Sequence, residues 1–393
     1  MRRPRIFGVL LTGLLCLTIV VLTGGQAVQA KGATDSKNNL DRAILSYNAL
    51  QKYFYQQDGS SLYLEQYPTQ SGDNTYSYEW PFSQAYIATL DLSALPGKAG
   101  REYTEALANR EIGQERFWNT TGATGLPGYD SYARQPYGNG GDKFYDDNEW
   151  VGLAKIQQYL TTGNRQALER ARQIFSLIVS GWDTDTTHAS PGGIFWTQAS
   201  WSSDRNTVSN MPGAELGLRL YQITGDRFYF DWAKRMYDWT NKYLQTPDGL
   251  YWDHLDLQGN IEKTEWSYNQ GVPVGVNVLL YKVTGNSSYL REAERIANAA
   301  LAYYGTSDIY KQPAYFNSIF FKNLLLLQSV DHKQSYARAM QTYADTVWKN
   351  YRDAQTGLFH FGSSTETQLL EQAAMIQIYA VLSWKPADYG DLY

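Results

Sequence analysis

The 393-residue sequence contains one cysteine, Cys16, and four histidines. Cys16 lies in an N-terminal apolar run, so the chain after residue 30 has no cysteine and its stability cannot depend on disulfides. The histidines are scattered and none forms an HExxH pair, which argues against a metalloenzyme. The serines show no GxSxG motif, which argues against a serine-hydrolase site. We therefore expect neither a metal nor a cofactor.

Clustered positive charge is missing as well. The chain has 34 Lys and Arg against 39 Asp and Glu, and no basic run follows the N-terminal segment. This excludes nucleic acid and anionic membrane surfaces as partners, because both need clustered Lys and Arg. Aromatic residues, in contrast, are abundant, with 32 Tyr, 12 Trp and 14 Phe. Most of them should fill a core, but aromatic faces also stack on sugar rings, so the composition favours a neutral polysaccharide as partner.

The N-terminus predicts export. Three arginines within the first five residues precede an apolar run over residues 6–22, and small residues follow up to Ala30. This pattern is typical of a secretory signal peptide, residues 1–30, although the run is long enough that an uncleaved membrane anchor is the alternative. Cys16 is not preceded by the small residue that lipid attachment requires. Residues 31–393 should form one secreted, monomeric domain without membrane contact.

A repeated Thr-Gly-Asn/Asp signature divides the chain into helical pairs. Gly163, Gly225 and Gly285 each follow an apolar helix at intervals of about 60 residues, and each glycine is expected to stop that helix. A second, more polar helix follows each stop and should lie on the outside. These predicted outer helices cover residues 166–179, 228–244 and 288–303.

The same alternation continues with weaker signatures towards both ends. It predicts outer helices over residues 36–55, 101–117 and 335–351, and inner helices over residues 80–95, 315–329 and 367–383. The chain thus contains six helical hairpins. An open array would need polar capping repeats, which neither end shows, so the sequence predicts an all-α (α/α)6 toroid.

The connections from outer to inner helices are long and share a second feature. They contain Gly-Gly-Ile-Phe-Trp at 192–196, Asp-Gly-Leu-Tyr-Trp at 248–252 and Thr-Gly-Leu-Phe-His at 356–360. Each predicts a turn followed by a short strand. All long loops should therefore gather at the rim where the inner helices begin, and loops on a rigid scaffold are where functional sites are built.

Asp146 and Asp147 open the predicted inner helix within residues 143–162, at this loop-bearing rim. Asp146 and Glu149 also fit a capping box, which is the purely structural alternative. The position at the rim favours catalysis. Glycoside hydrolysis needs one protonated and one ionised carboxyl group, and a helix N-terminus together with mutual repulsion can separate the two pKa values. Trp150, one turn on, is either a sugar platform or a packing residue.

Five segments carry a resemblance to a known family: FYDDNEWVGLA, GGIFWT, NTVSNMPGAELGLRLYQITGD, WSYNQGVPVGVNVLLYKVTGN and YFNSIFFKNLLLL. Together they resemble glycoside hydrolase family 76, the endo-α-1,6-mannanases, over essentially the whole chain after the signal. The resemblance implies an (α/α)6 barrel and a retaining mechanism, with Asp146 as nucleophile and Asp147 as general acid/base. Met211-Pro212 and the YFNSIF segment depart from the family pattern, which bears on linkage preference. The resemblance also implies these substrate-groove positions: Asn148, Trp150, Asn210, Tyr268, Asn269 and Gln270, with Trp196 and Phe316 as further additions.

Three alternatives stay open at this point. A cell-wall transglycosidase would use the same site with a sugar hydroxyl in place of water, and a glycan-binding protein would use the acids only as helix caps. A lyase or unsaturated-uronide hydrolase would need cationic residues facing a uronate, which the acidic balance disfavours. Asp183 to Thr187 imitates the start of a calcium loop but has His188 at the glycine position, so we interpret it as a solvated loop.

Overall fold

The computed structural model describes the backbone of residues 23–393 and the side chains from residue 38 onwards. The predicted signal peptide, with Cys16 and the anchor alternative, lies outside the residues described with side chains and stays a prediction. Among the described residues, no helix combines the length and apolarity needed to span a membrane.

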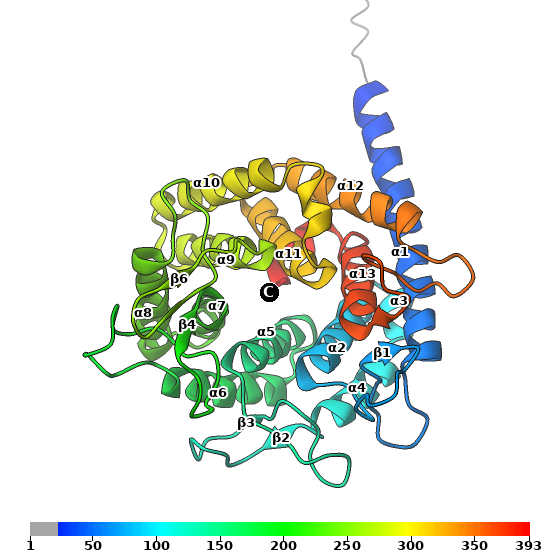
Figure 1. Cartoon of the computed structure of the whole chain (residues 1–393). Helices are drawn as coiled ribbons and strands as arrows, with labels where there is room; N and C mark the ends of the chain where they lie inside the picture. Colours follow the sequence, from blue (N-terminus) through cyan, green and yellow to red (C-terminus); the bar gives the residue numbers. More distant parts are fainter. Residues whose placement is uncertain (1–22) are drawn as a thin grey trace, which may run out of the picture.

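Two concentric rings of helices form the molecule, as Figure 1 shows in a view along the ring axis. Neighbouring inner helices pack against each other around the ring, and α13 packs on α2 and α1 to close it. The predicted all-α (α/α)6 toroid is thus confirmed. The inner helices are α2 (Glu79–Ser93), α5 (Tyr145–Thr162), α7 (Thr207–Thr224), α9 (Ser267–Thr284), α11 (Ala314–Asp331) and α13 (Leu369–Val381). The outer helices are α1 (Thr23–Tyr53), α3 (Lys98–Arg101) with α4 (Thr104–Gln114), α6 (Arg165–Ser180), α8 (Arg227–Tyr243), α10 (Ser287–Tyr304) and α12 (Ser335–Asn350).

The repeated glycine stops adopt the expected geometry. Gly163, Gly225 and Gly285 have φ of 74°, 72° and 70°, the left-handed region that glycine adopts at least cost. The next residue, Asn164 in the first repeat, accepts a hydrogen bond from the N–H two positions on (3.0 Å) and so caps the outer helix. His332 takes the glycine position between α11 and α12, with φ of 60°.

Short strands lie at one rim of the toroid. The expected strands after the three repeated turns are mostly single β-bridges, such as Trp182 with Ile194 and Gln245 with Tyr251. The strands pair as β1 with β7, β2 with β3, and β4 with β5 with β6, all antiparallel. Their bounds are β1 (Gln66–Tyr67), β2 (Trp118–Asn119), β3 (Gly128–Tyr129), β4 (Asp204–Asn206), β5 (His254–Asp256), β6 (Ile261–Glu262) and β7 (Thr367–Gln368).

The C-terminal segment fills the centre of the toroid. After the 3₁₀ helix η2 (Pro386–Asp391), Leu392 and Tyr393 are buried, and Figure 1 shows the chain end in the middle of the ring. Arg219 donates hydrogen bonds to the carbonyls of Gly390 (3.0 Å) and Leu392. The Lys322 ammonium lies 4.4 Å from the centroid of the Tyr393 ring. The tail thus packs against inner helices α7 and α11.

Candidate active site

Helix α5 begins at Tyr145, so Asp146 and Asp147 lie in its first turn. Its N-cap residue is Phe144, whose side chain makes no capping hydrogen bond. The Glu149 carboxyl is buried and is oriented towards the backbone of Gly213 on α7, so it does not reach back to the helix start. The capping-box alternative for the acid pair is therefore wrong.

Asp146 is held by Trp196 from the loop that follows α6. The Trp196 indole Nε1 donates to Oδ2 of Asp146 at 3.2 Å, and the Tyr145 N–H donates to the Trp196 carbonyl at 2.9 Å. Thr197 forms a β-bridge with Phe144 next to this contact. The loop is therefore paired directly to the start of α5, and this pairing fixes the indole against the carboxylate.

The pKa of Asp146 is raised to about 7, mainly because the side chain is buried, while the hydrogen bonds from Trp196 and the backbone oppose the rise. Asp204 at the start of β4 adds a further negative charge that raises this pKa. Asp146 is thus a carboxyl group with donors placed to stabilise its ionised form.

The three causes that act on the pKa of Asp147 all raise it well above its usual value: burial first, then the charge of Asp146, then that of Glu79. Glu79 lies in the first turn of α2, is fully buried, and accepts a hydrogen bond from Gln114. Burial also raises the pKa of Glu79 to about 8. Only Asp146 of the adjacent pair has hydrogen bonds that oppose the rise in pKa, so the two carboxyl groups lie in unequal environments. Unequal environments of this kind are what separates a base from an acid in a carboxyl pair.

Aromatic side chains flank the pair on two sides. On the α5 side, the Trp196 ring lies 4.9 Å from the Phe144 ring. On the opposite side, Tyr268 at the start of α9 stacks on Phe316 at the start of α11, with centroids 3.8 Å apart and planes at 10°. Tyr268 is close enough to Asp146 and Asp147 for both charges to raise its pKa. We call the α9–α11 rings, with Trp80 of α2 stacked on Phe316, the aromatic wall.

The amide side chains at the inner-helix starts point away from the substrate-groove positions that the resemblance implies and towards the backbone of the rim loops. Asn148, Asn210 and Gln270 are all fully buried, and their side chains bind backbone groups of the rim loops. The Tyr129 N–H donates to Oδ1 of Asn148 at 2.7 Å, and Asn148 Nδ2 returns a bond to the Tyr129 carbonyl at 3.0 Å.

Asn210 makes the same two-way contact with Ile194, and Gln270 makes it with Tyr251. In each of these buried amides the N–H groups are used by backbone carbonyls and the oxygen accepts a backbone N–H, so the polar groups already have partners within the fold. We refer to Asn148, Asn210 and Gln270 as the amide clamps. Their side chains hold the rim loops in this structure, and their assignment as direct substrate contacts stays a prediction.

Trp150 and Asn269 are buried as well. Trp150 is 1% exposed, with its ring 6.4 Å from that of Tyr393, so it packs inside the toroid as the packing alternative expects. Asn269 is 1% exposed and donates to Oδ1 of Asp253 at 3.0 Å, so it orients a carboxylate beside the site. Trp196, Tyr268 and Phe316 stay candidates for substrate contact.

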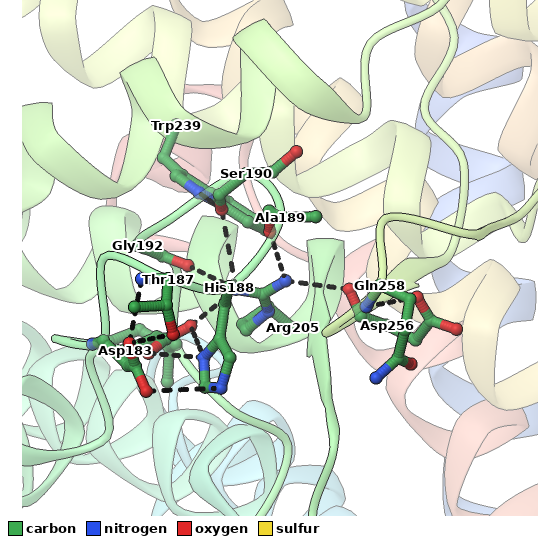
Figure 2. Close-up of polar contacts among 12 residues, drawn as sticks. Asp183, Thr187, His188, Ala189, Ser190, Gly192, Arg205, Trp239, Asp256 and Gln258 are labelled. Carbon is green, nitrogen blue, oxygen red and sulfur yellow. Dashed lines mark hydrogen bonds and ion pairs between the residues drawn. The ribbon is translucent and has the colours of Figure 1, made fainter.

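The loop that imitates a calcium site is held together by an arginine (Figure 2). Buried Arg205 of β4 pairs with Oδ2 of Asp183 at 2.6 Å and donates to the carbonyls of Ala189 (2.9 Å) and Asp256 (2.8 Å). His188 Nδ1 lies 3.0 Å from the same Asp183 oxygen. Asp183 is therefore buried and paired, whereas residues 184–187 are exposed, as expected of a solvated loop. The described residues contain no group of three or more His, Cys, Asp or Glu arranged for a metal ion.

Sequence reasoning missed Glu79, Asp204, Asp253 and Trp201 around the acid pair. Glu79 opens an inner helix as Asp146 does, and this shared position is the signal that was available. Asp204 and Asp253 lie at the rim loops beside strands β4 and β5, and nothing in their local sequence marks them. The pairing of β4 with β5 and the hydrogen bond from Asn269 to Asp253 bring them near the site.

The molecule is a toroid of six helical hairpins, with an acid pair between aromatic side chains at its loop-bearing rim. It thus has the two carboxyl groups that glycoside hydrolysis requires. The family profile of glycosyl hydrolase family 76 matches residues 39–380, and the chain belongs to this family.

Curated relatives and solved structures agree with this membership. A mannan endo-1,6-α-mannosidase of Candida glabrata is 29% identical over 155 residues, which is 37% of this chain and 34% of that protein. A putative mannan endo-1,6-α-mannosidase of Schizosaccharomyces pombe is 32% identical over 177 residues, 42% of this chain and 39% of that protein. The matched segment thus spans only about a third of the first relative's length. The crystal structure of a family 76 glycoside hydrolase from a bovine Bacteroides thetaiotaomicron strain has a TM-score of 0.78 and 26% identity, covering 88% of this chain and 77% of its own.

Proposed function

We propose that this protein is a secreted, retaining glycoside hydrolase that cleaves α-1,6-mannosidic linkages in a mannan-type polysaccharide. The observation that carries the proposal is the unequal environment of the two adjacent carboxyl groups, with hydrogen-bond donors on Asp146 and only pKa-raising influences on Asp147. The names of the matched relatives support the substrate and the linkage.

Each carboxyl group has one task in each of two steps. Asp147 first gives its proton to the glycosidic oxygen, while the Asp146 carboxylate attacks the anomeric carbon and the leaving sugar departs. The Asp147 carboxylate then takes a proton from water, whose oxygen displaces Asp146 from the anomeric carbon and restores both groups. Trp196 stabilises the Asp146 carboxylate by its indole N–H, and the aromatic wall provides an apolar face for the sugar ring.

Product analysis on linear α-1,6-mannan tests the proposal, with Asp146→Asn and Asp147→Asn beside the wild type and with Asp142→Asn as an exposed control just upstream. We expect mannose oligomers from the wild type and the control, and none from the two site variants. On an aryl α-1,6-manno-oligosaccharide, whose aryl oxide leaves without a proton, azide should rescue Asp146→Gly with formation of a β-mannosyl azide and Asp147→Gly with formation of the α-anomer. Products longer than the substrate would show the transglycosidase alternative, and binding without any product would show the glycan-binding alternative.

Export is part of the same proposal and rests on the predicted signal, residues 1–30. N-terminal sequencing of protein recovered from the culture medium should begin near Lys31. Recovery of the full-length chain only in the membrane fraction would instead establish the uncleaved anchor.

A further inference from the structure

Trp201 is the most exposed of the large apolar side chains in the described part of the chain, at 58%. An exposed indole leaves apolar surface in water that burial would stabilise. Where such surface is contiguous over several side chains, it marks a contact surface. Trp201 belongs neither to the hydrophobic core nor to the acid pair. Its exposure therefore needs an explanation from outside the fold.

The position of Trp201 points to the glycan. Its ring centroid lies 6.2 Å from that of Trp196 and 6.2 Å from that of Phe144. Trp196 itself is 36% exposed and donates to the Asp146 carboxylate. The exposed aromatic surface is thus continuous from the nucleophile candidate outwards, and Trp201 lies one ring further from Asp146 than Trp196 does.

The loop that carries Trp201 is closed and tied to the scaffold. The Gln198 N–H donates to the Lys143 carbonyl at 3.0 Å, and the Thr197 hydroxyl donates to the same carbonyl at 2.9 Å. The Ser202 N–H donates to the Ala199 carbonyl at 3.0 Å, which closes the turn around the indole. A ring on such a loop loses little freedom when it binds a ligand, and this favours affinity.

We propose that Trp201 forms an outlying subsite that binds a neutral hexose unit of the glycan beyond the unit held next to Asp146. This proposal rests on the proposed function and extends it to substrate length. A 1,6-linkage has an additional rotatable bond between neighbouring rings, so each outlying sugar must be ordered by a contact of its own. A separate aromatic platform supplies such a contact, and it favours long chains over short ones.

Kinetics with substrates of increasing length test the subsite in the full chain. For Trp201→Ala, we expect the increase in KM relative to the wild type to grow with the length of the substrate. The increase should be small for the shortest oligosaccharide that is cleaved and about tenfold for the polymer, the upper end of what one aromatic contact contributes. The value of kcat on the polymer should change little, and Trp201→Tyr should recover most of the affinity. Tyr303→Ala, an exposed aromatic of α10 at 53%, is the matched control and should match the wild type.

Three results would overturn the subsite: an unchanged KM on the polymer, an equal loss on all substrate lengths, or a change of oligomeric state in sedimentation, which would identify Trp201 as a self-association contact. Failure of the proposed function gives a different pattern. In affinity electrophoresis, mannan could slow the migration of the wild-type protein without being cleaved, and Trp201→Ala could lose this effect. That result would support the subsite and contradict the proposed hydrolase function.

Discussion

Replacing Gln270 by leucine removes one amide clamp and keeps a side chain of similar size. In the native structure, Oε1 of Gln270 accepts the Tyr251 N–H at 2.8 Å, and Nε2 donates to the carbonyls of Tyr251 (2.9 Å) and Trp266 (3.0 Å). Both Gln270 and Tyr251 are fully buried. The leucine variant therefore leaves a buried backbone N–H without the acceptor that it has in the wild type.

The expected loss follows from these three hydrogen bonds. An unsatisfied buried donor costs about 1–3 kcal/mol, and each of the two lost bonds to a carbonyl costs about 1 kcal/mol. The free energy of unfolding of Gln270→Leu should thus fall by about 3–5 kcal/mol, a large share of the roughly 5–15 kcal/mol that holds a typical domain folded.

Urea unfolding followed by circular dichroism measures this loss, with Gln258→Leu as control. Gln258 is exposed on the turn between β5 and β6, so the same substitution there should change the unfolding midpoint little. KM and kcat on mannan are measured for the same variants. A Gln270→Leu variant with wild-type stability and a raised KM would refute the clamp and return Gln270 to the substrate groove.

Three further changes test the charges inside the toroid. Glu79→Gln should move the basic limb of the kcat/KM profile to lower pH, because ionised Glu79 raises the pKa of Asp147 and so keeps the general acid protonated; an unchanged limb would contradict this. Burial raises the pKa of Glu215 to about 7, so the folded chain binds a proton that the unfolded chain releases above about pH 4.5. Stability should therefore fall as pH rises from about 5 to about 7, and Glu215→Gln should flatten that slope in thermal melts; a parallel slope would refute the assignment. Lys322→Met breaks a buried ion pair with Asp91 (2.8 Å) and should cost about 3–5 kcal/mol, while adding Asp91→Leu should restore much of it; additive losses in urea unfolding would show that the pair is not coupled.

The helical plan of this protein was predictable because its signals are local. A left-handed glycine and the capping residue after it act within a few positions, so Gly163 with Asn164 marks a helix end and the next helix start in the sequence itself. The predicted inner helix over residues 80–95 is α2, Glu79–Ser93. The predicted strands after the rim turns are shorter than expected, because Ile194, Tyr251 and Phe359 each pair with the preceding segment at a single bridge.

The site was only partly predictable, for physical reasons that differ between residues. Asp146 and Asp147 stood out because they open an inner helix at the loop-bearing rim. Glu79 also opens an inner helix, but only the fold shows that its charge acts on Asp147. The amide of Gln270 can bind a sugar or a backbone equally well, and only its burial shows that it does the latter.

The tail in the centre of the toroid has a consequence for the order of folding. Chains are synthesised from the N-terminus, yet the inner helices cannot complete their packing until the segment up to Tyr393 has entered the ring. The pairing of α1 with α13 likewise joins the two ends of the described chain. Ring closure therefore depends on contacts between residues far apart in the sequence, such as the hydrogen bond from Gln372 to the Ser46 carbonyl, 326 positions away. Contacts of such long sequence separation form late in folding, because the loop between them must close first.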